Sequence, residues 1–187
     1  MRRKRIIPEQ REAEHIALFI DMDNIYHAQK DFFGDTKRVC FRSMIDSIAD
    51  RNNNRHVLMA KAFLALHPDH GDAKKKFITS LERMNIQVIS KTCLVDKNGH
   101  ALKGKSNMDV EIAIHAMEAL YMPQIQTIVL VSGDGDFSAI GDYTKSFKKK
   151  FEVMGFQGSI SHSLTERADK VTYINNPQFL IPRKKAA

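Results

Sequence analysis

An uninterrupted apolar run, QTIVLVS over residues 126–132, constrains the fold of this chain more than any other feature. The run is short and rich in β-branched side chains, and a Gly-Asp-Gly-Asp turn follows it, so it predicts a strand. Because successive side chains of a strand point to opposite faces of a sheet, this strand needs an apolar cover on both sides. Such strands are typical of parallel sheets with helices on each face, so the run predicts an α/β fold.

The remainder of the chain alternates between strand-like and helix-like segments. Further strands are expected over residues 15–20, 55–66, 85–95 and 151–156. Apolar residues three and four apart predict helices over residues 24–33, 40–53, 73–84, 107–122 and 163–171, and GDGDF at 133–137 leads into another helix. Asn98-Gly99 predicts a hairpin turn. This alternation, without an internal repeat, predicts a doubly wound and mainly parallel sheet.

The positive charge is concentrated at the two ends of the chain. The 187 residues carry a net charge of +7, and four basic residues at positions 2–5 and three at 183–185 account for all of it. We expect a basic N-terminal tail over residues 1–14, one domain over residues 15–181, and a basic C-terminal tail over residues 182–187. Basic tails suit contact with nucleic-acid phosphates, but they also suit a purely solubilising role, and the charge leaves both readings open.

Other bulk properties exclude several classes of protein. No apolar run reaches the length of about 18 residues that spans a bilayer, and residues 1–15 lack the apolar stretch of a signal peptide. Cys40 and Cys93 have neither a metal-ligand spacing nor the number needed for a disulfide framework. We expect a soluble, cytoplasmic protein with no membrane partner.

Acidic residues follow two of the expected strands. Asp21 and Asp23 come directly after residues 15–20, and Asp134 and Asp136 come directly after residues 126–132. Ligands of an open parallel sheet bind at the carboxyl ends of the strands, where the strand order reverses. If the two strands are neighbours there, four carboxylates meet, and such a cluster normally needs a divalent cation at neutral pH. Taken alone, the first pair could also carry a nucleophile or cap a helix.

A third acidic position is Asp109, at the start of the helix expected over residues 107–122. Ser106 through Asp109 fits a capping box, which gives this acid a purely structural alternative. Glu111 and His115 stand four residues apart, and we interpret them as an exposed contact on the helix surface rather than a metal pair. No other His or Cys completes a softer site, so oxygen ligands favour magnesium or manganese over zinc.

Three segments in this order, LFIDMDNIY, KGKSNMDVEIAIHAM and VLVSGDGDFSAI, resemble the NYN domain, the LabA-like branch of the PIN-like nuclease superfamily. The resemblance spans roughly residues 15–160 and implies a three-layer α/β/α sandwich with a mainly parallel, Rossmannoid sheet. It also implies a ribonuclease site dependent on magnesium or manganese, with Asp21, Asp109 and Asp134 binding the metal. Asp136 would be a fourth catalytic acid and Asn24 a neighbouring site residue.

The sequence departs from the family pattern at one helical position. His115 stands where a second aspartate is common in the family, and extra residues precede Asp109, so cation binding is expected to be weaker or to need manganese. Carboxylate-held cations can supply what phosphodiester hydrolysis needs without a side-chain nucleophile. In this hypothesis Lys105 contacts a phosphate, and Ser132 lies at the substrate-binding strand end. Single-stranded RNA fits a narrow acidic crevice because its backbone bends easily.

Two other readings of the motifs are open. Phosphatases of the haloacid dehalogenase type also end their first strand with DxD, but Ile25 stands where a threonine or valine is typical of that class. A non-catalytic RNA-binding or adaptor protein on the same fold is the second alternative, because a fold does not guarantee an activity. A homodimer is possible for either function, since an amphipathic helix can face a second subunit as well as its own sheet.

Overall fold

Six parallel strands form the central layer of the protein. The computed structural model describes residues 12–68, 71–97, 100, 102 and 107–183. The strands are β1 (Glu14–Asp21), β3 (Arg55–Leu66), β4 (Gln87–Thr92), β5 (Thr127–Val131), β6 (Lys150–Gly155) and β7 (Lys170–Tyr173). Their spatial order is β4-β3-β1-β5-β6-β7, and every neighbouring pair is parallel. The α/β class with a mainly parallel sheet is therefore confirmed.

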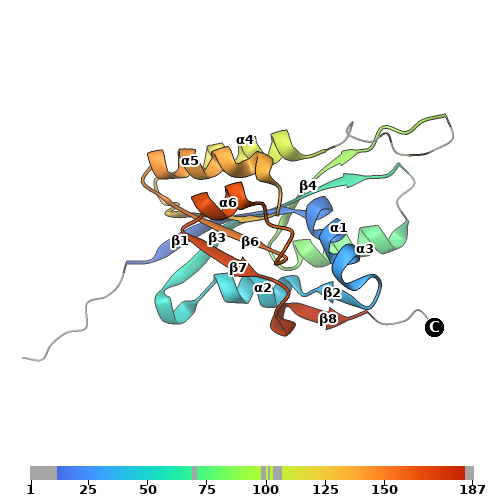
Figure 1. Ribbon diagram of the computed structural model, residues 1–187, viewed down its shortest axis with the longest axis horizontal. Helices are drawn as coiled ribbons and strands as arrows, with labels where there is room; N and C mark the ends of the chain where they lie inside the picture. The colour runs from blue at the N-terminus through green and yellow to red at the C-terminus, as the bar shows by residue number, and fades with distance from the viewer. Residues whose placement is uncertain (1–11, 69–70, 98–99, 101, 103–106, 184–187) are drawn as a thin grey trace, which may run out of the picture.

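Helices cover both faces of this sheet (Figure 1). α4 (Asp109–Leu120), α5 (Ser138–Ser146) and α6 (His162–Arg167) lie on one face, and α1 (Met22–Phe33), α2 (Phe41–Ile48) and α3 (Asp72–Glu82) lie on the other. Two apolar clusters correspond to these two interfaces. The fold is a three-layer α/β/α sandwich, as expected from the sequence.

The central strands are buried on both faces. All of β5 and residues Ile16 to Ile20 of β1 have no exposed surface. Side chains at even positions of β1 pack under α1 and α2, while Ala17 and Phe19 pack under α4. The continuous apolar runs thus reflect burial on two sides.

A second, two-stranded sheet was not expected from the sequence. β2 (Lys37–Val39) pairs antiparallel with β8 (Leu180–Pro182), which follows the short helix η3 (Pro177–Phe179). The buried ring of Phe179 and the bond from Cys40 N to Phe179 O, 2.7 Å, fix this pairing. The contact joins residues about 140 positions apart in the sequence, so no local pattern predicts it.

The helix expected over residues 163–171 is shorter than predicted. α6 ends at Arg167, and residues 170–173 form β7 against the edge of β6. Asp169 directs this change, because its Oδ2 accepts a bond from Phe151 N at 2.8 Å and holds the chain beside β6. Likewise, α2 ends at Ile48, and a separate turn, η1 (Arg51–Asn53), precedes β3. At β7, sheet pairing overrides the helical pattern.

Residues 93–97, which follow β4, extend beyond the sheet (Figure 1). The predicted turn at Asn98-Gly99 lies outside the described residues. On either side of it, Leu102 N donates to Leu94 O and Asp96 N donates to His100 O, each at 2.8 Å.

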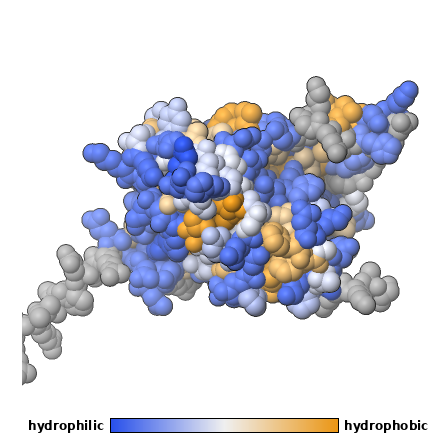
Figure 2. Space-filling view, viewed as in Figure 1, coloured by the Kyte–Doolittle hydropathy of each residue, from blue (hydrophilic) through white to orange (hydrophobic). Residues whose placement is uncertain are grey.

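The surface on the side of Figure 2 is largely hydrophilic, with apolar patches that include one over the layer of α4 and α5. None of the helices described is long and apolar enough to cross a membrane.

Candidate acidic site at the switch point of the sheet

The strand order reverses between β1 and β5. From β1 the chain proceeds to β3 and β4 on one side, and it returns through α4 to β5 on the other side. Ile20 pairs with Val131, so Asp21 and Ser132 reach the carboxyl edge at the same level. The expectation that these two strands are neighbours in the sheet is therefore confirmed.

Asp21 is the most buried acid at this edge, with 6% of its surface exposed. It is the N-cap of α1, and its Oδ1 accepts a bond from Asn24 N at 3.1 Å. Its Oδ2 accepts a bond from the Ser132 hydroxyl at 3.0 Å. Burial, together with the charges of Asp109 and Asp23, raises the pKa of Asp21 to about 6, against the lowering effect of these two donors.

The turn after β5 is bound to the start of α1. Gly133 N donates to Asn24 Oδ1 at 2.9 Å, which ties the two acidic segments together. Asp134 N donates to the Ser132 hydroxyl oxygen at 3.1 Å, and Asp136 N donates to Asp134 Oδ1 at 3.0 Å. Asp134 thus caps the short helix η2 (Gly135–Phe137). Ser132 has no exposed surface, so its hydroxyl orients Asp21 and Asp134 rather than contacting a ligand.

Asp109 approaches the same edge from the first residue of α4. The N-cap is Met108, without a side-chain cap bond, so Asp109 does not take the third helical position that a capping box requires. Instead, Asn107 Nδ2 donates to Asp109 Oδ2 at 2.6 Å. Burial raises the pKa of Asp109, and the charges of Asp134 and Asp136 add to this. Asp109 therefore lies within electrostatic reach of Asp134 and Asp136.

No described cation balances these carboxylates. Asp21, Asp109, Asp134 and Asp136 form no ion pair with any residue in the described part of the chain. Lys105, the predicted phosphate contact, lies outside the described residues. Within the described ranges, no three His, Cys, Asp or Glu side chains are close enough together to hold a metal ion. The carboxylates of Asp21, Asp109 and Asp134 each accept a hydrogen bond from a nearby donor, which lowers the cost of placing like charges near one another.

The loop between β6 and α6 packs against the turn that follows β5, a contact that the sequence analysis did not predict. A Cβ atom at Gly133 would lie 2.3 Å from the backbone oxygen of Ser159, and one at Gly135 would lie 2.8 Å from the Ser161 hydroxyl. Ser161 N also donates to Gly133 O at 2.9 Å. Only glycine permits such a close approach of the two segments. Gly133 and Gly135, on either side of Asp134, were the one signal of this contact in the sequence.

Asp23 serves a structural contact. Its Oδ2 accepts a bond from Ala65 N at 3.1 Å, which attaches the first turn of α1 to the end of β3.

Glu111 and His115 do not contact each other in the way we interpreted. Glu111 forms an ion pair with Lys91 on β4, and this ammonium lowers the pKa of Glu111. His115 Nδ1 lies 2.9 Å from Lys61 Nζ and 2.8 Å from Glu118 Oε2. The expected contact between Glu111 and His115 is therefore replaced by two separate contacts. Glu111 pairs with Lys91 on β4, and His115 lies beside Lys61 on β3.

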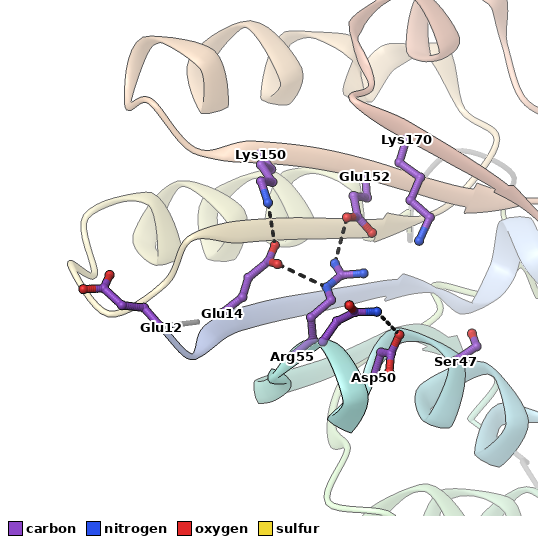
Figure 3. A pocket seen from close by; sticks show the side chains of 9 residues that line it. Glu12, Glu14, Ser47, Asp50, Arg55, Lys150, Glu152 and Lys170 are labelled. Atoms are coloured by element: carbon purple, nitrogen blue, oxygen red, sulfur yellow. Dashed lines mark hydrogen bonds and ion pairs between the residues drawn. The ribbon is translucent and has the colours of Figure 1, made fainter. Parts of the chain in front are cut away.

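A charged cavity lies at the opposite, amino edge of the sheet (Figure 3). It has a volume of about 450 Å³, and its central residue is the buried Arg55, 2.7 Å from Glu152 and 3.4 Å from Glu14. Burial acts to raise the pKa of Glu14, but the Thr127 hydroxyl, Arg55 and Lys150 together lower it. These ion pairs join the first residues of β1, β3 and β6, so the network fastens the amino edge of the sheet.

Comparisons with known proteins agree with this architecture. The chain is 24% identical over 173 residues to the low amplitude and bright protein LabA of Synechococcus elongatus, covering 90% of this chain and 88% of that protein. It is 35% identical over 79 residues to an uncharacterized protein of Methanocaldococcus jannaschii, covering 42% of this chain and 32% of that protein.

A crystal structure of a protein of unknown function from Vibrio parahaemolyticus shares the fold with a TM-score of 0.76. It is 25% identical, and the match covers 92% of this chain and 99% of that one. The model of the NYN domain matches residues 15–175, which include all the described acidic residues of the switch point. The chain therefore belongs to the NYN domain family of PIN-like, nuclease-type proteins.

Proposed function

We propose that the protein is a ribonuclease that hydrolyses RNA phosphodiester bonds with the help of magnesium or manganese. The observation that carries the proposal is that Asp21, Asp109 and Asp134 lie along one edge of the sheet, near enough for their charges to influence one another, without a described cation to balance them. An enzyme that gathers carboxylates against their own repulsion needs a positive charge at that place in its working state. The NYN family supports a nuclease-type activity in general.

The donor set fits a hard cation. Asp21, Asp109 and Asp134 offer only oxygen atoms, and magnesium commonly binds through one or two carboxylates while keeping several waters. It therefore does not need three side chains already in contact. These carboxylates would hold a divalent cation that, when bound, would supply positive charge for the phosphate oxygens and lower the pKa of an attacking water.

The residues of the chain have separate tasks in this proposal. Ser132 and Asn24 N hold the two oxygens of Asp21, so this carboxylate is fixed before any ligand arrives. Asp136 is exposed, while Asp109 and Asp134 are partly exposed, so substrate can approach from their side. Asp136 positions the attacking water or a second cation. Lys105 contacts a substrate phosphate, and Asn24 remains beside the site through Gly133.

Single-stranded RNA is the proposed substrate. The basic tails provide an attraction for phosphates that needs no sequence recognition, and a flexible strand reaches carboxylates at the edge of a sheet more easily than a stiff duplex. The phosphatase alternative is weakened because the second acid of DxD, Asp23, is bonded to Ala65 N.

The test compares RNA cleavage by the wild type and by Asp134→Asn, first with manganese and then with magnesium. A matched control is Asp46→Asn, because Asp46 is exposed on α2 at a distance from the acidic edge. We expect loss of cleavage in Asp134→Asn and full cleavage in the control. Equal cleavage traces for wild type and Asp134→Asn would rule out the proposed site. RNA binding without cleavage by the wild type would instead favour the adaptor function.

A further inference from the structure

Helix α4 has apolar residues on two opposite faces. Ile112, Ala116 and Ala119 are completely buried against the sheet. On the outer face, Val110 is 61% exposed, Ile114 is 52% exposed and Tyr121 is 72% exposed. Met117 lies between them in sequence and is partly buried. A surface helix normally carries polar residues on the face opposite the core, so the apolar outer face of α4 lacks a cover in a single chain.

The outer residues form a regular stripe. Val110, Ile114, Met117 and Tyr121 are separated by four, three and four positions, which is the spacing of the seam between two paired helices. At 100° per residue they lie within a narrow sector opposite the buried face. Val110, Ile114 and Tyr121 are exposed there, while Met117 at the side of the sector also packs against the core. We call these four residues the α4 stripe. Glu118, the exposed charge of this helix, lies beside the stripe and not within it.

The neighbouring helix enlarges the apolar surface. Tyr143 on α5 is 53% exposed, and the ring of Phe147 after α5 meets that of Tyr121 edge-on at 5.0 Å between centroids. In Figure 2 an apolar patch lies over this α4 and α5 layer. An aromatic side chain presents about 200 Å², so Tyr121 and Tyr143 alone expose about 250 Å². This is roughly a third of the area that one partner buries in a stable interface, before Val110 and Ile114 are added.

We propose that the α4 stripe is the interface of a homodimer, with α4 packed against α4 of a second copy of this chain. A second copy of this chain is the proposed partner because the spacing of the stripe is symmetric. The intervals between its residues are four, three and four positions in either direction along the helix. An antiparallel two-fold pairing places Val110 against Tyr121 of the partner subunit and Ile114 against Met117 of the partner subunit. Such a self-complementary patch is what a two-fold symmetric interface requires, and two-fold dimers are the commonest homo-oligomers. The inference does not depend on the proposed nuclease activity.

The experiment measures the molar mass of the full chain in solution by light scattering over a range of concentrations up to about 100 µM. We expect twice the 21.3 kDa of one chain for the wild type. Ile114→Lys keeps a good helix former but puts a charge into the stripe, so it should convert the dimer to a monomer. Leu58→Lys is the matched control, since Leu58 is also 52% exposed but lies on β3. It should remain a dimer.

Circular dichroism checks that each variant is folded. Tyr143→Ser, on the neighbouring helix, provides a second measurement if Ile114→Lys lowers the folded fraction, and it should weaken the dimer at least tenfold. A monomeric wild type at the highest concentration would overturn the proposal. So would an Ile114→Lys or Tyr143→Ser protein that is folded and as dimeric as the wild type.

Discussion

Replacing Asp21 by asparagine should make the metal-free protein more stable at neutral pH. Asp21 is buried, and its pKa is raised from 3.8 to about 6, chiefly by burial. A raised pKa means that the folded state binds the proton more tightly than the unfolded state, so folding stability falls as the pH rises from 3.8 to 6. At about 1.4 kcal/mol for each pH unit, the ionised carboxylate costs about 3 kcal/mol above this range.

Asparagine removes that cost but disturbs one hydrogen bond. The Ser132 hydroxyl now donates to Asp21 Oδ2, and an amide nitrogen at that position would force the hydroxyl hydrogen to lose its acceptor, at about 1 kcal/mol. The free energy of unfolding at pH 7.5 should therefore rise by about 2 kcal/mol. For a chain of this size this raises the midpoint temperature of thermal unfolding by roughly 4–8 °C. At pH 3.5 the carboxyl group is protonated in both states, so the gain should disappear.

Urea unfolding in EDTA at pH 3.5, 5.5 and 7.5 measures this effect. Asp46→Asn serves as the control, since Asp46 is exposed and the substitution should leave the pH dependence unchanged. If Asp21→Asn is no more stable than the wild type at pH 7.5, the buried charge does not strain the fold. A gain of equal size at all three pH values would show that the stabilisation has a cause other than ionisation. With manganese added at pH 7.5, the wild type should gain more stability than Asp21→Asn.

Further outcomes are expected at other positions. Gly133→Ala should destabilise the fold by about 1–3 kcal/mol, because the new methyl group would lie 2.3 Å from the Ser159 carbonyl oxygen. Gly71→Ala, with no atom within 4 Å of its Cβ, is the control in thermal unfolding and should cost less, because it creates no clash and loses only the preference for glycine over alanine at the N-cap of α3. Arg55→Met should cost about 3–5 kcal/mol in urea unfolding, because it leaves buried Glu152 without its partner. An unchanged midpoint for Arg55→Met would show that the amino-edge network does not stabilise the sheet.

The sequence predicted the elements whose signal is local. The apolar runs of β1, β3 and β5 are visible as continuous stretches because those strands are covered on both faces. The edge strand β7 was read as helix, since an edge strand of four residues carries little periodicity of its own. The pairing of β2 with β8 was missed for the same reason.

The candidate site was predicted in part. Asp21 and Asp134 were identified because an acid directly after a buried strand is a local signal, and the parallel sheet brings strand ends to one edge. Their hydrogen-bond donors, such as Ser132 for Asp21, could not be assigned in this way. The approach of Ser159 to Gly133 was also invisible, because it depends on a loop that leaves a different strand.

By itself, the sequence of this chain determined which segments become the buried strands and most of the helices, and that acids follow two of the buried strands. Periodicity and burial act over a few neighbouring residues, so they can be read along the chain. Only the tertiary structure decided that β1 and β5 lie side by side, that Asp109 joins them from α4, and that the α4 stripe faces outward. These arrangements depend on which strand edges and helix faces pair across the whole chain, and that choice minimises the free energy of the complete core.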